Sequence, residues 1–248
     1  MSEAHIGLAK RRLLRAGSPC TMGDMSRPQA PSALEPSRIP LRVLVIPGLN
    51  DSGPGHWQTW LQDQYHGSVR VAQDHWDRPD LQAWSDRIAR TLARHDPRTE
   101  WVAVAHSFGC LALAHHLGLS RAMADEGRLA ASGWPRVGFG RIRAALMVAP
   151  ASPDKFGVRH LLPSQGLGLP ATMVASDTDP WMSAREAHDW ADRWGTRFTN
   201  LGDAGHINVE SGHGPWLLAR YKVDEMIRYL QRTRRLELAH PLEFHYAV

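Results

Sequence analysis

The sequence contains few cysteines and no long apolar run. Its 248 residues include only Cys20 and Cys110, too few for a disulfide framework or a thiolate metal site. We therefore expect a reducing compartment, the cytoplasm. No stretch reaches the ~18 apolar residues that cross a membrane, and Arg15 interrupts the short apolar pair after the first basic residues. The sequence predicts neither a membrane segment nor an export signal.

A strong excess of charge is also missing. The chain has 29 basic and 25 acidic residues, a net charge of +4 at pH 7. Residues 1–40 hold six basic and three acidic residues, so the remainder is nearly neutral. Ten tryptophans are present, but no basic stripe alternates with them as in single-stranded nucleic-acid binders. We therefore predict no nucleic-acid partner.

The order of apolar runs predicts a single α/β domain. Residues 1–40 are rich in Pro, Ser and Arg without a period and are predicted to be a flexible N-terminal extension. Six strands are expected, at 41–46, 69–72, 101–105, 144–149, 171–175 and 197–201. Helices are expected at 56–64, 80–95, from about 111 to 117, at 184–194 and at 215–232. Such alternation predicts a mainly parallel six-stranded sheet with helices on both faces.

Three segments break this pattern. Residues 120–141 are rich in Gly, Ala and Arg and are interpreted as an excursion. Residues 150–170 contain four prolines and are expected to form a loop or short lid over a pocket. Residues 233–248 have no clear period and are read as a C-terminal tail. The predicted domain therefore covers residues 41–232.

A serine lies between a predicted strand and a predicted helix. Ala105, Ser107 and Gly109 form a small-x-Ser-x-Gly pattern, in which small neighbours permit the sharp turn of a nucleophile elbow. Serine is also common at helix N-termini, where its hydroxyl caps the backbone. The motif alone therefore leaves both interpretations open, and further partners are needed to decide between them.

Those partners follow other predicted strands. In a parallel sheet, ligands bind beyond the carboxyl ends of the strands, so residues that follow the strands share one edge. That edge would hold a Gly-rich turn, the serine, three acidic residues and a histidine: Gly48, Leu49, Asn50, Ser107, Asp177, Asp179, Asp203 and His206. The chain order Ser, Asp, His is that of the α/β-hydrolases.

The chemistry explains why these residue types belong together. The hydroxyl of Ser107 needs a base to become a nucleophile, and His206 can accept its proton and return it to a leaving group. A carboxylate would orient that imidazole. The backbone N–H groups of Leu49 and Phe108 would stabilise a tetrahedral oxyanion, with Gly48 allowing close approach. The residues alone leave the identity of the acid open.

Four blocks of sequence together resemble a known family. They are Pro47–Trp57, Ala105–Cys110, Ser176–Pro180 and Gly205–Asn208. These blocks are similar to those of the YdeN-like serine hydrolases, small α/β-hydrolases related to retinoblastoma-binding protein 9. The resemblance covers residues 41 to about 230 and departs from the general elbow at Ala105. It implies Ser107 as nucleophile, His206 as base and Asp179 as acid, with Asp177 as its rival.

Other residues near these motifs are candidates for substrate contact. Asn50, His56, Trp57 and Trp181 lie in the motif loops and are expected to line a pocket. His106, next to the candidate nucleophile, is expected to pack rather than to catalyse, and His115 and His116 are expected to be surface or core residues.

The sequence thus predicts a serine hydrolase that cleaves a small ester, thioester or amide through an acyl-enzyme, without metal or cofactor. Two alternatives stay open: an interaction protein that retains the fold, and an acyltransferase that uses the same site. The expected partner is a small-molecule substrate. The oligomeric state stays open.

Overall fold

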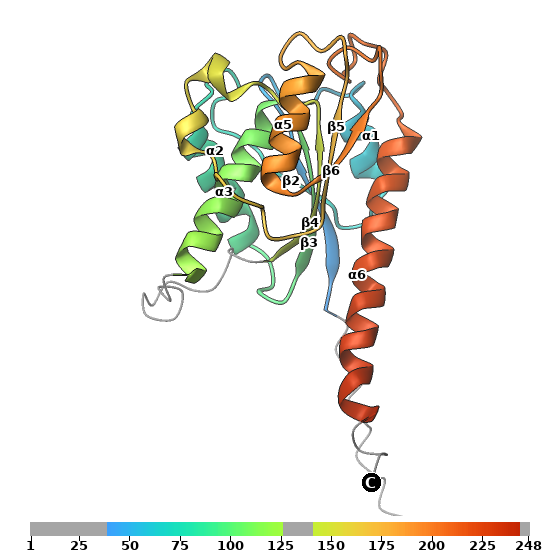
Figure 1. Cartoon of the computed structure of the whole chain (residues 1–248). Coiled ribbons are helices and arrows are strands. Elements are labelled where there is room, and N and C mark those ends of the chain that lie inside the picture. The colour runs from blue at the N-terminus through green and yellow to red at the C-terminus, as the bar shows by residue number, and fades with distance from the viewer. Residues whose placement is uncertain (1–38, 126–140, 244–248) are drawn as a thin grey trace, which may run out of the picture. The chain divides into compact units, whose positions relative to one another are not determined.

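A six-stranded parallel sheet forms the centre of the molecule (Figure 1). The computed structural model describes residues 39–125 and 141–243. The strands are β1 (Leu41–Ile46), β2 (Val69–Arg70), β3 (Glu100–His106), β4 (Ile142–Val148), β5 (Ala171–Ala175) and β6 (Arg197–Asn200). Their order across the sheet is β2-β1-β3-β4-β5-β6, and every neighbouring pair is parallel. The predicted fold class is confirmed.

Helices cover both faces of the sheet. The helices are α1 (Trp57–Asp63), α2 (Leu81–Ala93), α3 (Phe108–Asp125), α5 (Ala184–Trp194) and α6 (Leu217–Glu243), with short 3₁₀ helices η1 (Pro153–Phe156) and η2 (Arg159–Leu161). Figure 1 shows α2, α3 and α5 on one side and α1 and α6 on the other. Because parallel strands need helical crossovers, the central strands are buried on both faces and read as unbroken apolar runs.

The side chains of β1 illustrate this double burial. Leu44 and Ile46 pack into the core beneath α2, α3 and α5, while Val43 and Val45 pack into the core beneath α1 and α6. Side chains alternate between the faces of a strand, so β1 contributes to both cores. The helices begin at polar caps: Asp80 accepts a hydrogen bond from the Ala83 N–H, and Ser183 accepts one from the Glu186 N–H.

Two helices are longer than the sequence pattern predicts. α3 continues to Asp125, so the predicted excursion does not begin at residue 120; the Ser120 hydroxyl donates to the His116 carbonyl within the helix. α6 continues to Glu243, which corrects the predicted tail from residue 233. The helix extends past the sheet here (Figure 1), and residues 231–237 bury no face, so no apolar period marks them. Helix-forming residues and the contacts of Arg234 with Glu100 and the Ile39 carbonyl support this part instead.

The predictions for residues 1–38, 126–140 and 244–248 lie outside the described residues. Among the described residues, no helix is long and apolar enough to cross a membrane.

Two glycines allow the loop after β1 to pack against the turn after β3. A Cβ on Gly48 would lie 2.7 Å from the Cβ of Ser107. A Cβ on Gly109 would collide with the carbonyl oxygens of Ile46 and Pro47. The start of α3 therefore approaches the end of β1 at a distance that only glycine permits.

We expect Gly109→Ala to lower the free energy of unfolding by about 1–3 kcal/mol, because the added methyl group would push backbone atoms apart. This cost exceeds the gain of up to ~1 kcal/mol that alanine offers in a helix. Urea unfolding at pH 7 measures the change. Gly53→Ala is the matched control, since a Cβ there meets no atom within 4 Å. Equal stability of the two variants would contradict the proposed close contact.

Candidate active site

Ser107 occupies the sharp turn between β3 and α3. Its φ is +53°, in the left-handed region that non-glycine residues rarely adopt. The Ser107 N–H donates to the Val148 carbonyl at 3.1 Å, which anchors this strained residue to β4. Helix α3 begins at Phe108, so the positive end of its dipole lies beside the serine. This strand–turn–helix arrangement is that of a nucleophile elbow.

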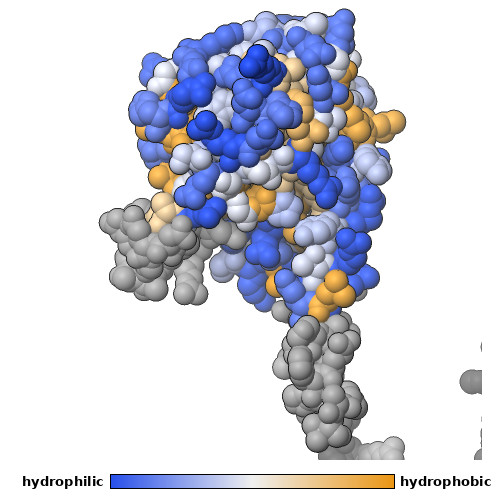
Figure 2. Space-filling model, in the orientation of Figure 1, coloured by the Kyte–Doolittle hydropathy of each residue, from blue (hydrophilic) through white to orange (hydrophobic). Residues whose placement is uncertain are grey.

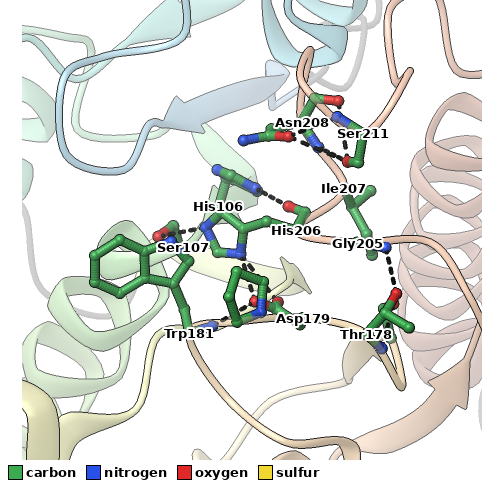
Figure 3. Close-up of polar contacts among 12 residues, drawn as sticks. His106, Ser107, Thr178, Asp179, Trp181, Gly205, His206, Ile207, Asn208 and Ser211 are labelled. Atoms are coloured by element: carbon green, nitrogen blue, oxygen red, sulfur yellow. Dashed lines mark hydrogen bonds and ion pairs between the residues drawn. The ribbon is translucent and has the colours of Figure 1, made fainter.

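Ser107, His206 and Asp179 form a continuous chain of hydrogen bonds (Figure 3). Nε2 of His206 lies 3.0 Å from Oγ of Ser107, and Nδ1 lies 2.9 Å from both carboxylate oxygens of Asp179. An ionised carboxylate only accepts hydrogen bonds, so Nδ1–H donates to Asp179 and Nε2 is left to accept the serine proton. The Asp179 side chain is 2% exposed, which keeps water away from this charge-assisted bond.

Only one of the three candidate acids reaches the histidine. The Asp179 carboxylate also accepts a hydrogen bond from the Trp181 N–H at 2.8 Å, which orients it. Asp177 accepts one from the Asn200 side chain at 2.7 Å, and Asp203 accepts one from the Thr178 hydroxyl at 2.7 Å. Asp177 and Asp179 both lie on the loop after β5, but their carboxylates have different partners, and only that of Asp179 contacts His206.

Two ring N–H groups hold the loop that carries His206. Nε2 of His106 donates to the His206 carbonyl at 3.0 Å, and Nε1 of Trp57 donates to the Ile207 carbonyl at 2.8 Å. Ile207 has a φ of +48°, which is strained for a β-branched residue and costs of order 1–3 kcal/mol. These two buried hydrogen bonds stabilise the strained turn, and His106 packs as predicted.

Three imidazoles lie in a row beside the serine. The ring centroid of His106 is 4.9 Å from that of His56 and 4.8 Å from that of His206. Burial lowers the pKa of His56 to about 4 and the pKa of His106 well below its usual value. Both neighbours therefore stay neutral at pH 7, so neither repels a positive charge on His206.

The backbone around Ser107 offers donors for an oxyanion. Phe108 is the first residue of α3, and the first N–H groups of a helix have no intrahelical acceptor. Leu49 follows Gly48, whose backbone lies against the Ser107 side chain. Within the described part of the chain, the N–H groups of Leu49 and Phe108 form no backbone hydrogen bond. Both predicted donors are thus beside Ser107, and their function stays a prediction.

Aromatic side chains border the histidine. Trp181 is 41% exposed, and its ring centroid lies 6.1 Å from that of His206. Phe156 of η1 stacks on Trp181 at 6.2 Å and contacts Phe108 at 5.0 Å. Phe156, from the segment 150–170, and Trp181 together form an aromatic wall next to the hydrogen-bonded triad. The predicted contact of Trp181 with substrate stays a prediction that this exposure favours.

The other predicted substrate contacts differ in their surroundings. Trp57 is fully buried, which corrects the expectation that its ring lines an open pocket. It packs edge-on against Trp216 and holds the Ile207 carbonyl instead. His56 is 5% exposed and caps α1, where its Nδ1 accepts a hydrogen bond from the Gln58 N–H. Asn50 is exposed and has a φ of +64°. Their contact with substrate stays a prediction.

Sequence reasoning missed the part played by Gln58. Its fully buried amide donates to the carbonyls of Ile46 and Val104 and accepts from the Ser52 hydroxyl, so it joins the ends of β1 and β3. A polar residue beside Trp57 on the buried side of α1 was the available signal. Because a buried amide must find partners, its position is set by these two strand ends.

A second nucleophilic side chain, Cys110, lies three residues after Ser107. Burial raises the pKa of the Cys110 thiol, so it stays protonated and is a poor nucleophile. No group of three metal-ligating side chains stands together in residues 39–125 and 141–243.

Comparisons with known proteins show the family to which the chain belongs. Residues 43–225 match the model of the serine hydrolase family. A YdeN-like hydrolase from Pectobacterium atrosepticum is 30% identical, with a TM-score of 0.65 over 77% of this chain and 92% of that one. The ydeN product of B. subtilis is 15% identical, with a TM-score of 0.58 over 75% of this chain and 98% of that one. Est1E from Butyrivibrio proteoclasticus with ferulic acid is 12% identical, with a TM-score of 0.55 over 79% of this chain and 92% of that one. No curated protein matches the chain.

A serine at the elbow of an α/β-hydrolase sheet defines the class of protein. The chain belongs to the serine hydrolase family, and its resemblance to the YdeN-like members is confirmed.

The buried His56 makes stability dependent on pH. An unfolded histidine binds its proton near pH 6.5, whereas folded His56 does so only near pH 4. Between these values the unfolded state binds more protons, so acidification favours unfolding. We expect His56→Asn, which retains a capping side chain, to reduce the loss of stability between pH 7 and pH 5 by about 2 kcal/mol.

Urea unfolding at both pH values measures this effect. His188→Asn is the control, because His188 on α5 is half exposed. A pH dependence that is the same in wild type and His56→Asn would show that His56 does not stay neutral in the folded protein.

Proposed function

We propose that this protein hydrolyses small carboxylic esters, thioesters or amides through an acyl-enzyme on Ser107. The single observation that carries the proposal is the hydrogen-bonded chain from Ser107 through His206 to Asp179. The family supports hydrolysis in general. The hydrogen bonds among Ser107, His206 and Asp179 support nucleophilic catalysis by serine in particular.

The first half of the reaction forms the acyl-enzyme. Oγ of Ser107 attacks the substrate carbonyl carbon while its proton passes to Nε2 of His206. Asp179 holds the imidazole with Nδ1–H toward the carboxylate and stabilises the imidazolium. The tetrahedral intermediate then collapses: the bond to the leaving alcohol, thiol or amine breaks, and His206 returns the proton to that group.

The second half releases the acid. A water molecule attacks the acyl carbon and gives its proton to His206, and the bond to Oγ of Ser107 breaks as the serine recovers that proton. In both halves, negative charge develops on the former carbonyl oxygen. The N–H groups of Leu49 and Phe108 would stabilise it, each by about 3–4 kcal/mol.

The surroundings of His206 favour an apolar acyl group. Trp181 and Phe156 present aromatic surface on the open side of the triad. Lys155 lies 5.4 Å from the Trp181 ring centroid and also donates to the Pro180 carbonyl, so this cation is engaged with the ring and the backbone. Est1E, which shares the fold, binds ferulic acid, an aromatic acid. We therefore propose uncharged esters with an aromatic or short acyl chain as substrates.

Substitution within one loop tests the roles of the two acids. We expect Asp179→Asn to lower kcat for p-nitrophenyl acetate about 10³–10⁴-fold, because the amide cannot hold the required histidine tautomer. Asp177→Asn, the matched control two residues away, keeps an oxygen that can accept from Asn200 and is expected to change kcat less than threefold. Ser107→Ala is expected to abolish the burst of acyl-enzyme formation.

Steady-state and pre-steady-state kinetics with folded proteins measure these effects. Equal losses in the two aspartate variants would contradict the assignment of the acid. Turnover retained in Ser107→Ala would refute the acyl-enzyme altogether.

The ring N–H groups of His106 and Trp57 form a clamp on the loop that carries His206. We expect this clamp to affect kcat more than KM. Trp57→Phe removes the N–H that holds the Ile207 carbonyl but preserves most of the ring packing. A small displacement of His206 lowers kcat, by about tenfold to a hundredfold, with little change in KM. Trp190→Phe is the control, since Trp190 is also buried, on α5, and lies outside this clamp. Equal kcat values for the two variants would assign Trp57 a purely structural role.

A further inference from the structure

Arg70 connects three segments of the chain. It lies at the end of β2, and its guanidinium group donates hydrogen bonds to the loop after β1 and to α1. Nη1 donates to Oδ1 of Asp51 at 2.7 Å and to the Ser52 carbonyl at 2.9 Å. Nη2 donates to Oγ1 of Thr59 at 2.7 Å, and Nε donates to Oε1 of Gln62 at 3.0 Å. The planar fork of the arginine thus ties the loop after β1 to α1.

The loop that Arg70 holds is strained at two successive residues. Asn50 has a φ of +64° and Asp51 a φ of +62°, both in the left-handed region. Residues 50 and 53–55 are exposed, and Figure 2 shows mainly hydrophilic residues on the visible face of the end where the strands finish. Apolar packing therefore contributes little to this part of the loop, and hydrogen bonds must hold its conformation.

One of these hydrogen bonds sets the direction of the Leu49 N–H. The Asp51 N–H donates to the Gly48 carbonyl at 3.2 Å. This carbonyl and the Leu49 N–H belong to one peptide group, which is planar and trans, so they point in opposite directions. Fixing the carbonyl therefore fixes the N–H. A Cβ on Gly48 would lie 3.3 Å from Oγ of Ser107, so this peptide group lies beside the candidate nucleophile.

We propose that Arg70 is a positioning residue that acts through Asp51 to hold the Leu49 N–H in the orientation of an oxyanion donor. The guanidinium group fixes the Asp51 side chain and the carbonyl that follows it, and the Asp51 N–H fixes the Gly48–Leu49 peptide group. A donor that is already oriented needs no reorganisation when negative charge develops. This inference rests on the proposed function, because the donor acts only if a tetrahedral intermediate forms on Ser107.

A purely structural role for Arg70 predicts a different result. The same guanidinium group attaches β2 to α1, so its loss would then lower stability without disturbing the oxyanion donor. An ester and its thionoester separate the two roles. In the thionoester, sulfur replaces the carbonyl oxygen, and sulfur is a weak hydrogen-bond acceptor. The ratio of kcat/KM for the ester to kcat/KM for the thionoester therefore reports on the oxyanion donors, whereas the nucleophile and the base act on both substrates.

Turnover of p-nitrophenyl benzoate and of its thionobenzoate tests the proposal. We expect Arg70→Met to lower kcat/KM for the ester about tenfold to a hundredfold and for the thionoester less than about threefold. Arg70→Lys, which keeps the charge without the fork, should give an intermediate ratio. Trp57→Phe, which is expected to displace His206, should lower both values by the same factor.

Arg234→Met is the matched control. Arg234 also contacts one carboxylate, that of Glu100, and one main-chain carbonyl, that of Ile39, but it does so at the amino end of β3. We expect this variant to leave both kcat/KM values unchanged. Circular dichroism verifies that each variant is folded. A ratio in Arg70→Met equal to that of the wild type would overturn the inference, whatever the fall in the two rates.

Nuclear magnetic resonance separates this inference from the proposed function. In protein isotopically labelled at the leucine nitrogens, the Leu49 amide resonance should shift in Arg70→Met and stay in place in Arg234→Met. An unchanged Leu49 resonance in Arg70→Met would also overturn the inference. A wild-type protein that hydrolyses neither substrate would refute the proposed function, and the Leu49 resonance would then still decide whether Arg70 orients this N–H.

Discussion

The hydrogen bond between Ser107 and His206 is the interaction on which the account of this protein depends. It joins two loops 99 residues apart, at 3.0 Å, and the backbone is strained on both sides of it. Ser107 and Ile207 have positive φ. The Ser107 N–H donates to the Val148 carbonyl, and the Ile207 carbonyl accepts from Nε1 of Trp57, so both strained residues are anchored through their backbone. Folding energy from the two cores is therefore used to hold the candidate catalytic groups in position.

Polar groups buried beside the site hold the loops of the triad in position. His106 and Trp57 donate to consecutive carbonyl groups of the His206 loop, and Gln58 joins the ends of β1 and β3. These donors come from α1 and from the residue before the serine, two segments far apart in the sequence that both lie beside the triad. Burial keeps His106 neutral, so the loop is held without placing a second positive charge beside His206.

Much of the fold could be predicted from the sequence because it rests on local patterns, whereas the choice of Asp179 over Asp177 as the acid came from the family resemblance. The predicted strands that correspond to β3, β5 and β6, with the turns after them, place Ser107, Asp179 and His206 at one edge of the sheet. The buried role of Trp57 could not be predicted, since a tryptophan in a motif loop is equally compatible with a pocket wall. The length of α6 could not be predicted either, because from Thr233 onward the sequence has no apolar period. Gln58 was missed because its amide N–H groups bind two main-chain carbonyl groups, and the sequence does not show which carbonyl groups lack a donor.

Reaction with a fluorophosphonate, followed by intact-mass and peptide mass spectrometry, tests the central claim most directly. The account predicts one adduct per chain on Ser107, formed much more slowly in His206→Ala and absent in Ser107→Ala. An unlabelled folded wild-type protein, or an adduct that persists in Ser107→Ala, would contradict the claim that His206 activates this serine.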